Sequence, residues 1–220
     1  MKRMFLAFFD FDSTLIEQEI IDELAHAVGK KEEVSRLTRE TMEGKHTYPE
    51  SLKKRTAALA GLSLNEIERV AHGITFRHRF DVLGKWLHDH QFKTSIITGS
   101  FDNVLSLLDG TRFFDYLFTN HLEEFNGKLT GNVHARVIDN KGELARNLKQ
   151  QLNIPTERCV AVGDGSTDIP VFEQCGFSIA LNAKSIVRTA ATVACDTNDL
   201  SDLIPHLEAW HSSASLVSSS

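Results

Sequence analysis

Two pairs of aspartates mark where this sequence could perform chemistry. Asp10 and Asp12 follow an apolar run of strand length, and Asp164 and Asp168 follow a second such run. Residues i and i+2 of a strand face the same side, so we expect the first pair to leave the end of a strand together. Four carboxylates on one sheet edge repel one another unless a cation lies among them. Because oxygen ligands without a His or Cys cluster favour magnesium over zinc, the pattern predicts a Mg²⁺ site.

A hydroxyl and a lysine could hold an anion beside those acids. Thr98 ends the apolar run 94–97, so its hydroxyl and the next backbone amides would face the same crevice. Lys141 opens a segment of helical spacing, where a positive charge opposes the helix dipole and is better explained by a nearby anion. Taken singly, Lys141 is as readily a solvated lysine, and a capped turn is the less favoured interpretation of Asp10 and Asp12. The order along the chain of the first aspartate pair, the hydroxyl, the lysine and the second aspartate pair decides between these interpretations.

The elements that must position these residues alternate between strands and helices. Continuous apolar runs are typical of strands that are covered on both faces of a parallel sheet; they lie at 4–9, 94–97, 116–118, 160–162 and 177–181. Segments with helical spacing separate them, at 80–90, 104–108, 142–152, 169–175 and 200–207. This alternation predicts an α/β fold with a doubly wound parallel sheet. Asn126-Gly127 predicts a hairpin turn between arms at 122–125 and 128–133.

The region 16–75 interrupts the alternation. It has no strand-like run, and helical periodicity occurs at 19–28, 32–42, 51–59 and 64–72. These segments predict a small four-helix cap domain inserted after the first strand, with residues 1–15 and 76–210 forming the α/β core. Ligands of open α/β sheets bind at the carboxyl ends of the strands, so the cap would lie above the site. The tail 211–220 contains six serines and is expected to fray.

Composition excludes several other functions. The 220 residues carry 24 basic and 30 acidic side chains and a net charge of -6, without a basic cluster interleaved with aromatics, so neither nucleic acid nor a membrane surface is an expected partner. Cys159, Cys175 and Cys195 form neither a CxxC site nor a disulfide framework. No apolar run approaches the length of about 18 residues that a membrane span needs. The cytoplasm is the expected compartment.

Taken in order, the paired aspartates, the strand-end hydroxyl, the lysine and the glycine-spaced aspartates resemble the haloacid dehalogenase (HAD) superfamily of phosphohydrolases. The strings DFDSTL, ESLKKR, KGEL and GDGSTDI, with NGKLTG in the hairpin, carry the likeness. It runs from the first strand to the last expected helix and is strongest to the phosphoserine phosphatases. The resemblance implies a Rossmann-like, HAD-like core with its cap.

The resemblance also implies a magnesium-dependent phosphomonoester hydrolase. Its reaction would convert O-phosphoserine to serine and phosphate, the last step of serine biosynthesis, through an aspartyl-phosphate intermediate. Asp10 would be the nucleophile, and Asp12 would protonate the departing alkoxide and then take a proton from the attacking water. The Mg²⁺ ion would be held by Asp10, the backbone carbonyl of Asp12 and Asp164, with Asp168 close by as a ligand or acceptor.

The same resemblance implies contacts for the rest of a substrate. Thr98 and Lys141 would hold phosphoryl oxygens, joined by backbone amides near Phe11 and Gly99. Phosphoserine also carries an ammonium and a carboxylate, which the resemblance assigns to one acidic and one basic residue of the cap. The residues at the matching positions, with those that would wall the pocket, are Glu19, Arg55, Met42, Tyr48 and Thr167. Without the resemblance, Glu19 and Arg55 would be interpreted as solvent-facing charges on helices.

Two departures from the family pattern bear on the substrate. The motif around the hydroxyl is commonly Ser-Gly-Gly, whereas here it is Thr98-Gly99-Ser100. Thr167 also replaces the asparagine that usually precedes the last motif aspartate, and its hydroxyl offers a shorter reach than an amide. Both changes leave the metal chemistry intact but alter the surroundings of the phosphate ester.

Three alternatives remain open from the sequence. One is another HAD phosphatase or phosphotransferase that acts on a different small phosphorylated metabolite. A second is a signalling receiver domain, against which the sixty-residue insert and Asp12 both argue, and a third is an inactive binding protein with the same fold. A monomer and a homodimer are equally compatible with the chain.

Overall fold

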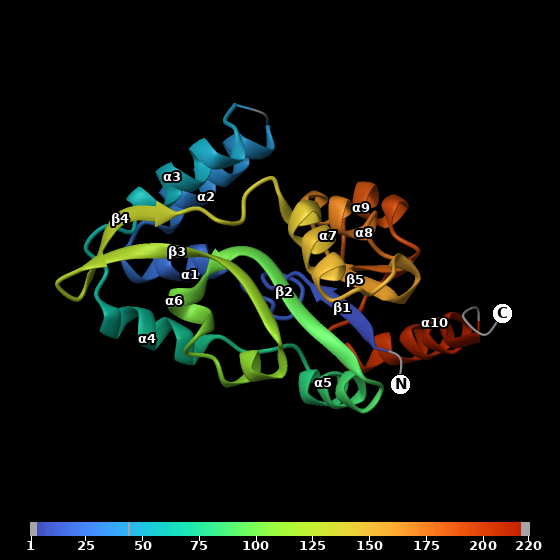
Figure 1. Ribbon diagram of the computed structural model, residues 1–220. Helices are drawn as coiled ribbons and strands as arrows, with labels where there is room; N and C mark the ends of the chain where they lie inside the picture. Colours follow the sequence, from blue (N-terminus) through green and yellow to red (C-terminus); the bar gives the residue numbers. More distant parts are fainter. Residues whose placement is uncertain (1–3, 44, 217–220) are drawn as a thin grey trace.

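The first strand, β1 (Phe5–Phe9), lies at the centre of the sheet because all five of its side chains are apolar and buried. The computed structural model describes residues 4–43 and 45–216, and its strands form one sheet in the order β4-β3-β2-β1-β5-β6-β7 (Figure 1). The other bounds are β2 (Phe92–Phe101), β3 (Tyr116–Phe125), β4 (Lys128–His134), β5 (Cys159–Gly163), β6 (Phe177–Leu181) and β7 (Val193–Cys195). All neighbouring strands pair in parallel except β3 and β4, which are antiparallel. The predicted doubly wound α/β sheet is confirmed, with one antiparallel edge strand.

The direction of winding reverses at β1. The chain proceeds from β1 through β2 and β3 to one edge of the sheet, and later through β5, β6 and β7 to the other. The loops that follow β1 and its neighbours therefore diverge above the carboxyl ends of these strands. Ligands of open α/β sheets bind at such a reversal, so the fold positions a site beside the residues that follow β1.

Helices cover both faces of the sheet, as Figure 1 shows. Phe5, Ala7 and Phe9 share one hydrophobic core with α5 and α10, whereas Leu6 and Phe8 belong to a second core with α7, α8 and α9. Successive side chains of β1 point to opposite faces of the sheet, so this one strand contributes side chains to both cores. The helices outside the cap are α5 (Phe80–Asp89), α6 (Asp102–Leu105), α7 (Lys141–Gln151), α8 (Ile169–Phe172), α9 (Ser185–Ala190) and α10 (Ile204–Leu216). Short 3-10 turns lie at η1 (Asp109–Phe113), η2 (Thr156–Arg158), η3 (Ser166–Asp168) and η4 (Leu200–Leu203).

The region between β1 and α5 forms four helices. Their bounds are α1 (Ile20–Ala27), α2 (Lys31–Met42), α3 (Tyr48–Ala57) and α4 (Leu64–Gly73). A capping box of Ser63 and Glu66 starts α4: the side chain of each residue accepts a hydrogen bond from the backbone N–H of the other. Thr47 and Glu50 start α3 in the same way.

The β3–β4 hairpin extends from the core sheet to the cap (Figure 1). Leu129 of β4 donates to the Leu62 carbonyl at 2.8 Å and accepts from Gly61 at 2.8 Å, and the Leu64 N–H donates to Gly127 at 3.1 Å. The hairpin thus adds a third connection between cap and core, besides the two linkers of the chain.

The C-terminal segment departs from expectation. The tail was expected to fray from His211, but α10 continues to Leu216; residues 217–220 lie outside the described ranges. The His211 ring packs on Phe5 with centroids 4.3 Å apart, and Ala214 is buried. These contacts with the core stabilise the last turns of the helix despite the serines beside them.

Candidate active site

Three carboxylates meet above the carboxyl ends of β1 and β5. Asp10 directly follows β1, Asp164 directly follows β5, and Asp168 ends the turn η3. One carboxylate oxygen from each lies within 4.8 Å of the others. Because β1 and β5 are paired in parallel, the residues after them lie side by side. The two loops therefore converge and bring together three of the four acids that the sequence was expected to gather.

The loop after β5 is shaped around Asp168. The Oδ2 atom of Asp168 accepts from the backbone N–H groups of Asp164 at 3.2 Å and Gly165 at 3.0 Å. A Cβ on Gly163 would collide with this same carboxylate, so glycine is required for the loop to close so tightly. Asp164 is oriented separately, because the Thr14 hydroxyl donates to its Oδ1 atom at 2.8 Å.

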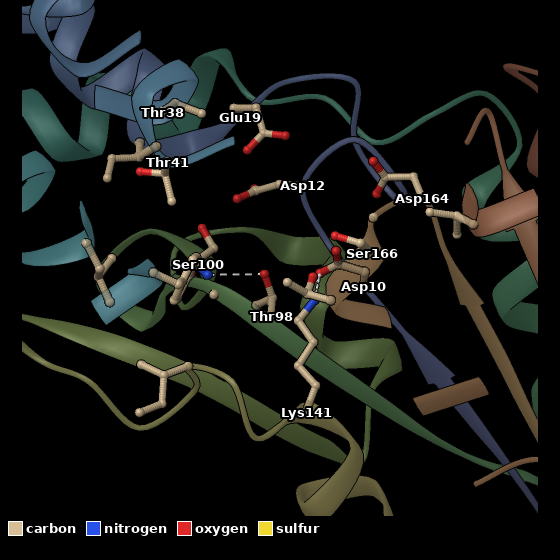
Figure 2. A pocket seen from close by; sticks show the side chains of 18 of the residues that line it. Asp10, Asp12, Glu19, Thr38, Thr41, Thr98, Ser100, Lys141, Asp164 and Ser166 are labelled. Atoms are coloured by element: carbon tan, nitrogen blue, oxygen red, sulfur yellow. Dashed lines mark hydrogen bonds and ion pairs between the residues drawn. The ribbon is translucent and has the colours of Figure 1, made fainter. Parts of the chain in front are cut away.

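Lys141 supplies the positive charge of the cluster. It is 5% exposed at the start of α7, and its Nζ atom lies 3.0 Å from Asp10 Oδ1 (Figure 2). The same Nζ atom lies 2.8 Å from Asp168 Oδ1. Burial opposes the charge on Lys141, but Asp10 and Asp168 outweigh it and raise its pKa. We expected a nearby anion to explain a lysine at the start of a helix, and the carboxylates of Asp10 and Asp168 are such anions.

One lysine does not neutralise the cluster. Burial, followed by the charge of Asp168, raises the pKa of Asp10 to about 7, although Lys141 acts against this. Burial raises the pKa of Asp164 to about 6, and the neighbouring Asp168 adds to the shift. Crowded, buried carboxylates of this kind are stabilised in the ionised form by a further cation. The donor set consists of oxygens alone, so the residues present fit a hard divalent ion such as Mg²⁺.

Thr98, Gly99 and Ser100 form an irregularity in β2. Ile97 pairs with Phe118 and Phe101 with Asn120, so the three residues between leave the regular ladder. Thr98 and Ser100 are 1% and 2% exposed, yet both line the cavity. The Ser100 N–H donates to the Thr98 hydroxyl at 3.1 Å, which holds the bulged segment together.

Asn120 supports this bulge from β3 and was missed by the sequence analysis. Its Nδ2 atom donates to the carbonyls of Gly99 at 2.8 Å and Val137 at 3.0 Å, and its Oδ1 atom accepts from the N–H groups of Arg136 and Val137 at 2.8 Å. The side chain thereby connects the bulge with the loop that leads to Lys141. Asn120 lies two residues after the apolar run 116–118, among other polar residues, so nothing in the sequence indicated this role.

Asp12 lies apart from the carboxylate cluster. Strand β1 ends at Phe9, so the strand alternation that would keep Asp10 and Asp12 together no longer applies. Asp12 faces the cap, where its Oδ1 atom accepts from the Ile20 N–H at 3.4 Å (Figure 2). Burial, and then the charges of Glu19 and Asp10, raise the pKa of Asp12 well above its usual value. Both effects favour the protonated form of this carboxyl.

The Phe11 amide is not free in this structure. It donates to Asp10 Oδ1 at 2.7 Å, while the Phe11 ring is fully buried beside Phe76. The Gly99 backbone, in contrast, faces the cap: a Cβ at this position would collide with the Tyr48 hydroxyl. Tyr48 thus brings the first turn of α3 down onto the bulge of β2.

The cap encloses a cavity of about 570 Å³ above these groups. Glu19 and Arg55 both line it, from the start of α1 and from α3. Glu19 accepts from the Ser13 hydroxyl at 2.8 Å, and the Arg55 guanidinium lies 5.7 Å from the Tyr48 ring centroid. The buried Arg55 Nε atom has no hydrogen-bond partner among the described residues. A charge of each sign therefore faces the same cavity.

The remaining expected pocket residues differ in position. Thr167 is exposed on η3 at the rim of the cavity. Met42 ends α2, and its side chain lies outside the described part of the structure. Thr38 and Thr41, on the same helix, line the cavity and were not singled out from the sequence, since they resemble ordinary helix-surface residues.

Known proteins resemble this chain over nearly its full length. The haloacid dehalogenase-like hydrolase family model matches residues 7–173. Phosphoserine phosphatase of Methanocaldococcus jannaschii is 35% identical over 94% of this chain and 99% of that protein, and the Wolinella succinogenes phosphoserine phosphatase is 38% identical over 93% and 100%. A solved structure described as a phospho-aspartyl intermediate analogue of phosphoserine phosphatase superposes with a TM-score of 0.85 at 35% identity, covering 93% of this chain and 99% of the other. A substrate-bound phosphoserine phosphatase complex gives 0.85 at 34% identity, with coverages of 94% and 99%.

Fold and site together define a capped, doubly wound α/β protein whose acidic site contains one buried lysine. The matched family model spans most of the chain. The chain belongs to the haloacid dehalogenase-like hydrolases. None of the helices in the described ranges has both the length and the apolar character needed to cross a membrane.

Proposed function

We propose that this protein is a magnesium-dependent phosphoserine phosphatase, which hydrolyses O-phosphoserine to serine and phosphate in the cytoplasm as the last step of serine biosynthesis. The observation that carries the proposal is the placement of Asp10 beside Asp164, Asp168 and Lys141, under a cap that presents Glu19 and Arg55. The likeness to proteins named phosphoserine phosphatase supports the choice of substrate.

The first half of the reaction uses Asp10 and Asp12. A carboxylate oxygen of Asp10 attacks phosphorus, and the bond between phosphorus and the ester oxygen breaks, leaving an aspartyl phosphate. Asp12, whose raised pKa favours the protonated form, gives its proton to the departing alkoxide, and serine leaves. The assignment of acid to Asp12 fits its position away from the cluster and toward the cap.

The second half reverses the role of Asp12. Water attacks phosphorus and loses a proton to the Asp12 carboxylate, while the bond to Asp10 breaks and phosphate is released. Thr98 and Lys141 hold phosphoryl oxygens through both transfers, and the amides near Gly99 and Phe11 add donors once the Asp10 oxygen is engaged elsewhere. A bound Mg²⁺, held by Asp10, Asp164, Asp168 and the Asp12 carbonyl, would neutralise negative charge on the phosphoryl group.

The cap contacts determine the substrate in this proposal. Arg55 can grip a carboxylate with two parallel hydrogen bonds, and its unpartnered Nε atom is available for one of them. Glu19 would receive the substrate ammonium. Both groups line one cavity, which meets the need of phosphoserine for one partner of each sign.

A turnover assay over serine, threonine and sugar phosphates tests the proposal. We expect phosphoserine to be preferred, activity to vanish with a chelator and return with Mg²⁺, and Asp10→Asn to abolish turnover while the thermal unfolding curve stays cooperative. If another phosphate ester ranks first, the protein is a HAD phosphatase of different specificity. Full activity in the presence of a chelator would exclude the metal-dependent mechanism.

A further inference from the structure

Ser100 has a buried hydroxyl that lies near the Asp12 carboxyl but forms no well-aligned hydrogen bond with any described residue. The residue is 2% exposed and lines the cavity, and its Oγ atom has no hydrogen-bond partner among the described residues. Other hydroxyls near the cavity are engaged, such as those of Thr14 with Asp164 and Ser13 with Glu19. A buried hydroxyl without a partner destabilises the fold, so a partner supplied by a ligand would account for it.

The direction of the hydroxyl is visible in Figure 2. It points toward Asp12 and the cap residue Thr41, on the side away from Lys141. It faces the Asp12 carboxyl without forming a well-aligned hydrogen bond with it. Its own backbone N–H is already engaged with Thr98.

We propose that the Ser100 hydroxyl hydrogen-bonds to the alcohol part of the phosphate ester, next to the ester oxygen, and thereby favours polar leaving groups. This inference rests on the proposed function, because Asp12 marks the leaving-group side only if it protonates the ester oxygen. Thr98 and Lys141 define the opposite, phosphoryl side of the cavity. A neutral hydroxyl beside Asp12 and near the cap can donate to a carboxylate of the alcohol part, which an apolar leaving group lacks.

Ser100 is therefore a specificity residue, and its position distinguishes this chain from the usual Ser-Gly-Gly pattern. A glycine at this position would offer no side chain to the leaving group. The added hydroxyl comes from a rigid bulge that Asn120 holds through the Gly99 carbonyl, so it is presented to the ligand in one orientation.

Ser100→Ala tests the inference, and Ser95→Ala is the matched control. Ser95 lies on the same strand, is fully buried and also has an unpartnered hydroxyl, but it does not line the cavity. The readouts are kcat/KM for O-phosphoserine and for phenyl phosphate in the presence of Mg²⁺, and product inhibition by serine and by inorganic phosphate. We expect Ser100→Ala to lower kcat/KM for phosphoserine about fivefold to tenfold, the usual effect of one lost neutral hydrogen bond.

The remaining readouts separate the possible causes. We expect phenyl phosphate turnover to stay within about twofold, inhibition by serine to weaken in parallel with phosphoserine turnover, and inhibition by phosphate to be unchanged. Equal losses on both substrates would place the hydroxyl on the phosphoryl group, and no loss on either would show that it contacts no ligand; each result overturns the inference. A wild-type protein that hydrolyses no phosphoserine would instead remove the proposed function, and this inference with it.

Discussion

Asp10 and Asp164 would couple the binding of a metal ion to the binding of protons. Burial and the neighbouring charge of Asp168 raise their pKa values to about 7 and about 6, against 3.8 in an unfolded chain. Between pH 4 and 7 the folded state therefore binds more protons than the unfolded state, so the contribution of these groups to the free energy of unfolding falls as the pH rises. A divalent ion replaces those protons and reverses the trend.

This linkage predicts how Mg²⁺ changes thermal stability. We expect Mg²⁺ to raise the Tm more at pH 8 than at pH 5, because protons compete for the same carboxylates at the lower pH. Asp164→Asn should remove most of the Mg²⁺-dependent rise in Tm at both pH values. Thermal unfolding with and without a chelator measures this rise. Asp109→Asn, at a side chain that is 94% exposed, is the control and should keep it. An equal increment at both pH values would contradict metal binding by this cluster.

At the scale of elements, the contact between α3 and β2 decides how the cap closes. The Tyr48 hydroxyl occupies the space where a side chain of residue 99 would lie. The backbone of Gly99 is not in the left-handed region, so alanine can adopt its conformation there. A methyl group at this position would hence displace Tyr48 without unfolding the strand.

Gly99→Ala should impair the enzyme more than the fold. We expect kcat/KM for phosphoserine to fall about tenfold to a hundredfold, because a shift of the cap by an ångström misplaces the substrate groups. The Tm should change by only a few degrees, since the displaced atom is the end of a side chain. Gly73→Ala, in α4 with nothing near the added methyl, is the matched control for activity. Unchanged kinetics for Gly99→Ala would mean that Tyr48 does not limit closure.

The elements also show how far sequence reasoning reaches. Buried strands and the residues directly after them were predictable, because a continuous apolar run fixes both the strand and the place where Asp10 or Asp164 must emerge. β7 was not predictable, because none of its three residues is buried and three residues are too few to show a pattern. Asn120 was missed because its role depends on partners from two other segments. The side chain of Asp12 faces the cap because β1 ends at Phe9. A strand one residue longer would have changed its direction, and the sequence does not fix that boundary.

At the scale of the whole molecule, the central strand β1 and the last helix α10 are packed against each other. His211 of α10 lies against Phe5, with its ring centroid 5.4 Å from that of His90. Burial, and then the charge of His90, lowers the pKa of His211. Below pH 6.5 the unfolded chain therefore binds a proton that the folded state resists, and this contribution to stability is lost as the pH falls.

His211→Phe should reduce this acid sensitivity. We expect the variant to lose less stability than the wild type between pH 7 and pH 5, because the aromatic packing remains and the titrating group is gone. Denaturant unfolding at both pH values measures the difference. His206→Phe, on the same helix, should retain the wild-type dependence on pH. The same loss in His211→Phe as in the wild type would place the acid-sensitive group elsewhere.

The hairpin bonds to Gly61, Leu62 and Leu64 restrict how a substrate can enter. Swinging the whole cap away on its two linkers would break these three backbone hydrogen bonds at once. The edge that carries α2 and the start of α3 has no such attachment to β4 through backbone bonds among the described residues. Entry is therefore expected from that side, by a partial lift, and the aperture this creates sets an upper limit on substrate size before any contact inside the cavity is made.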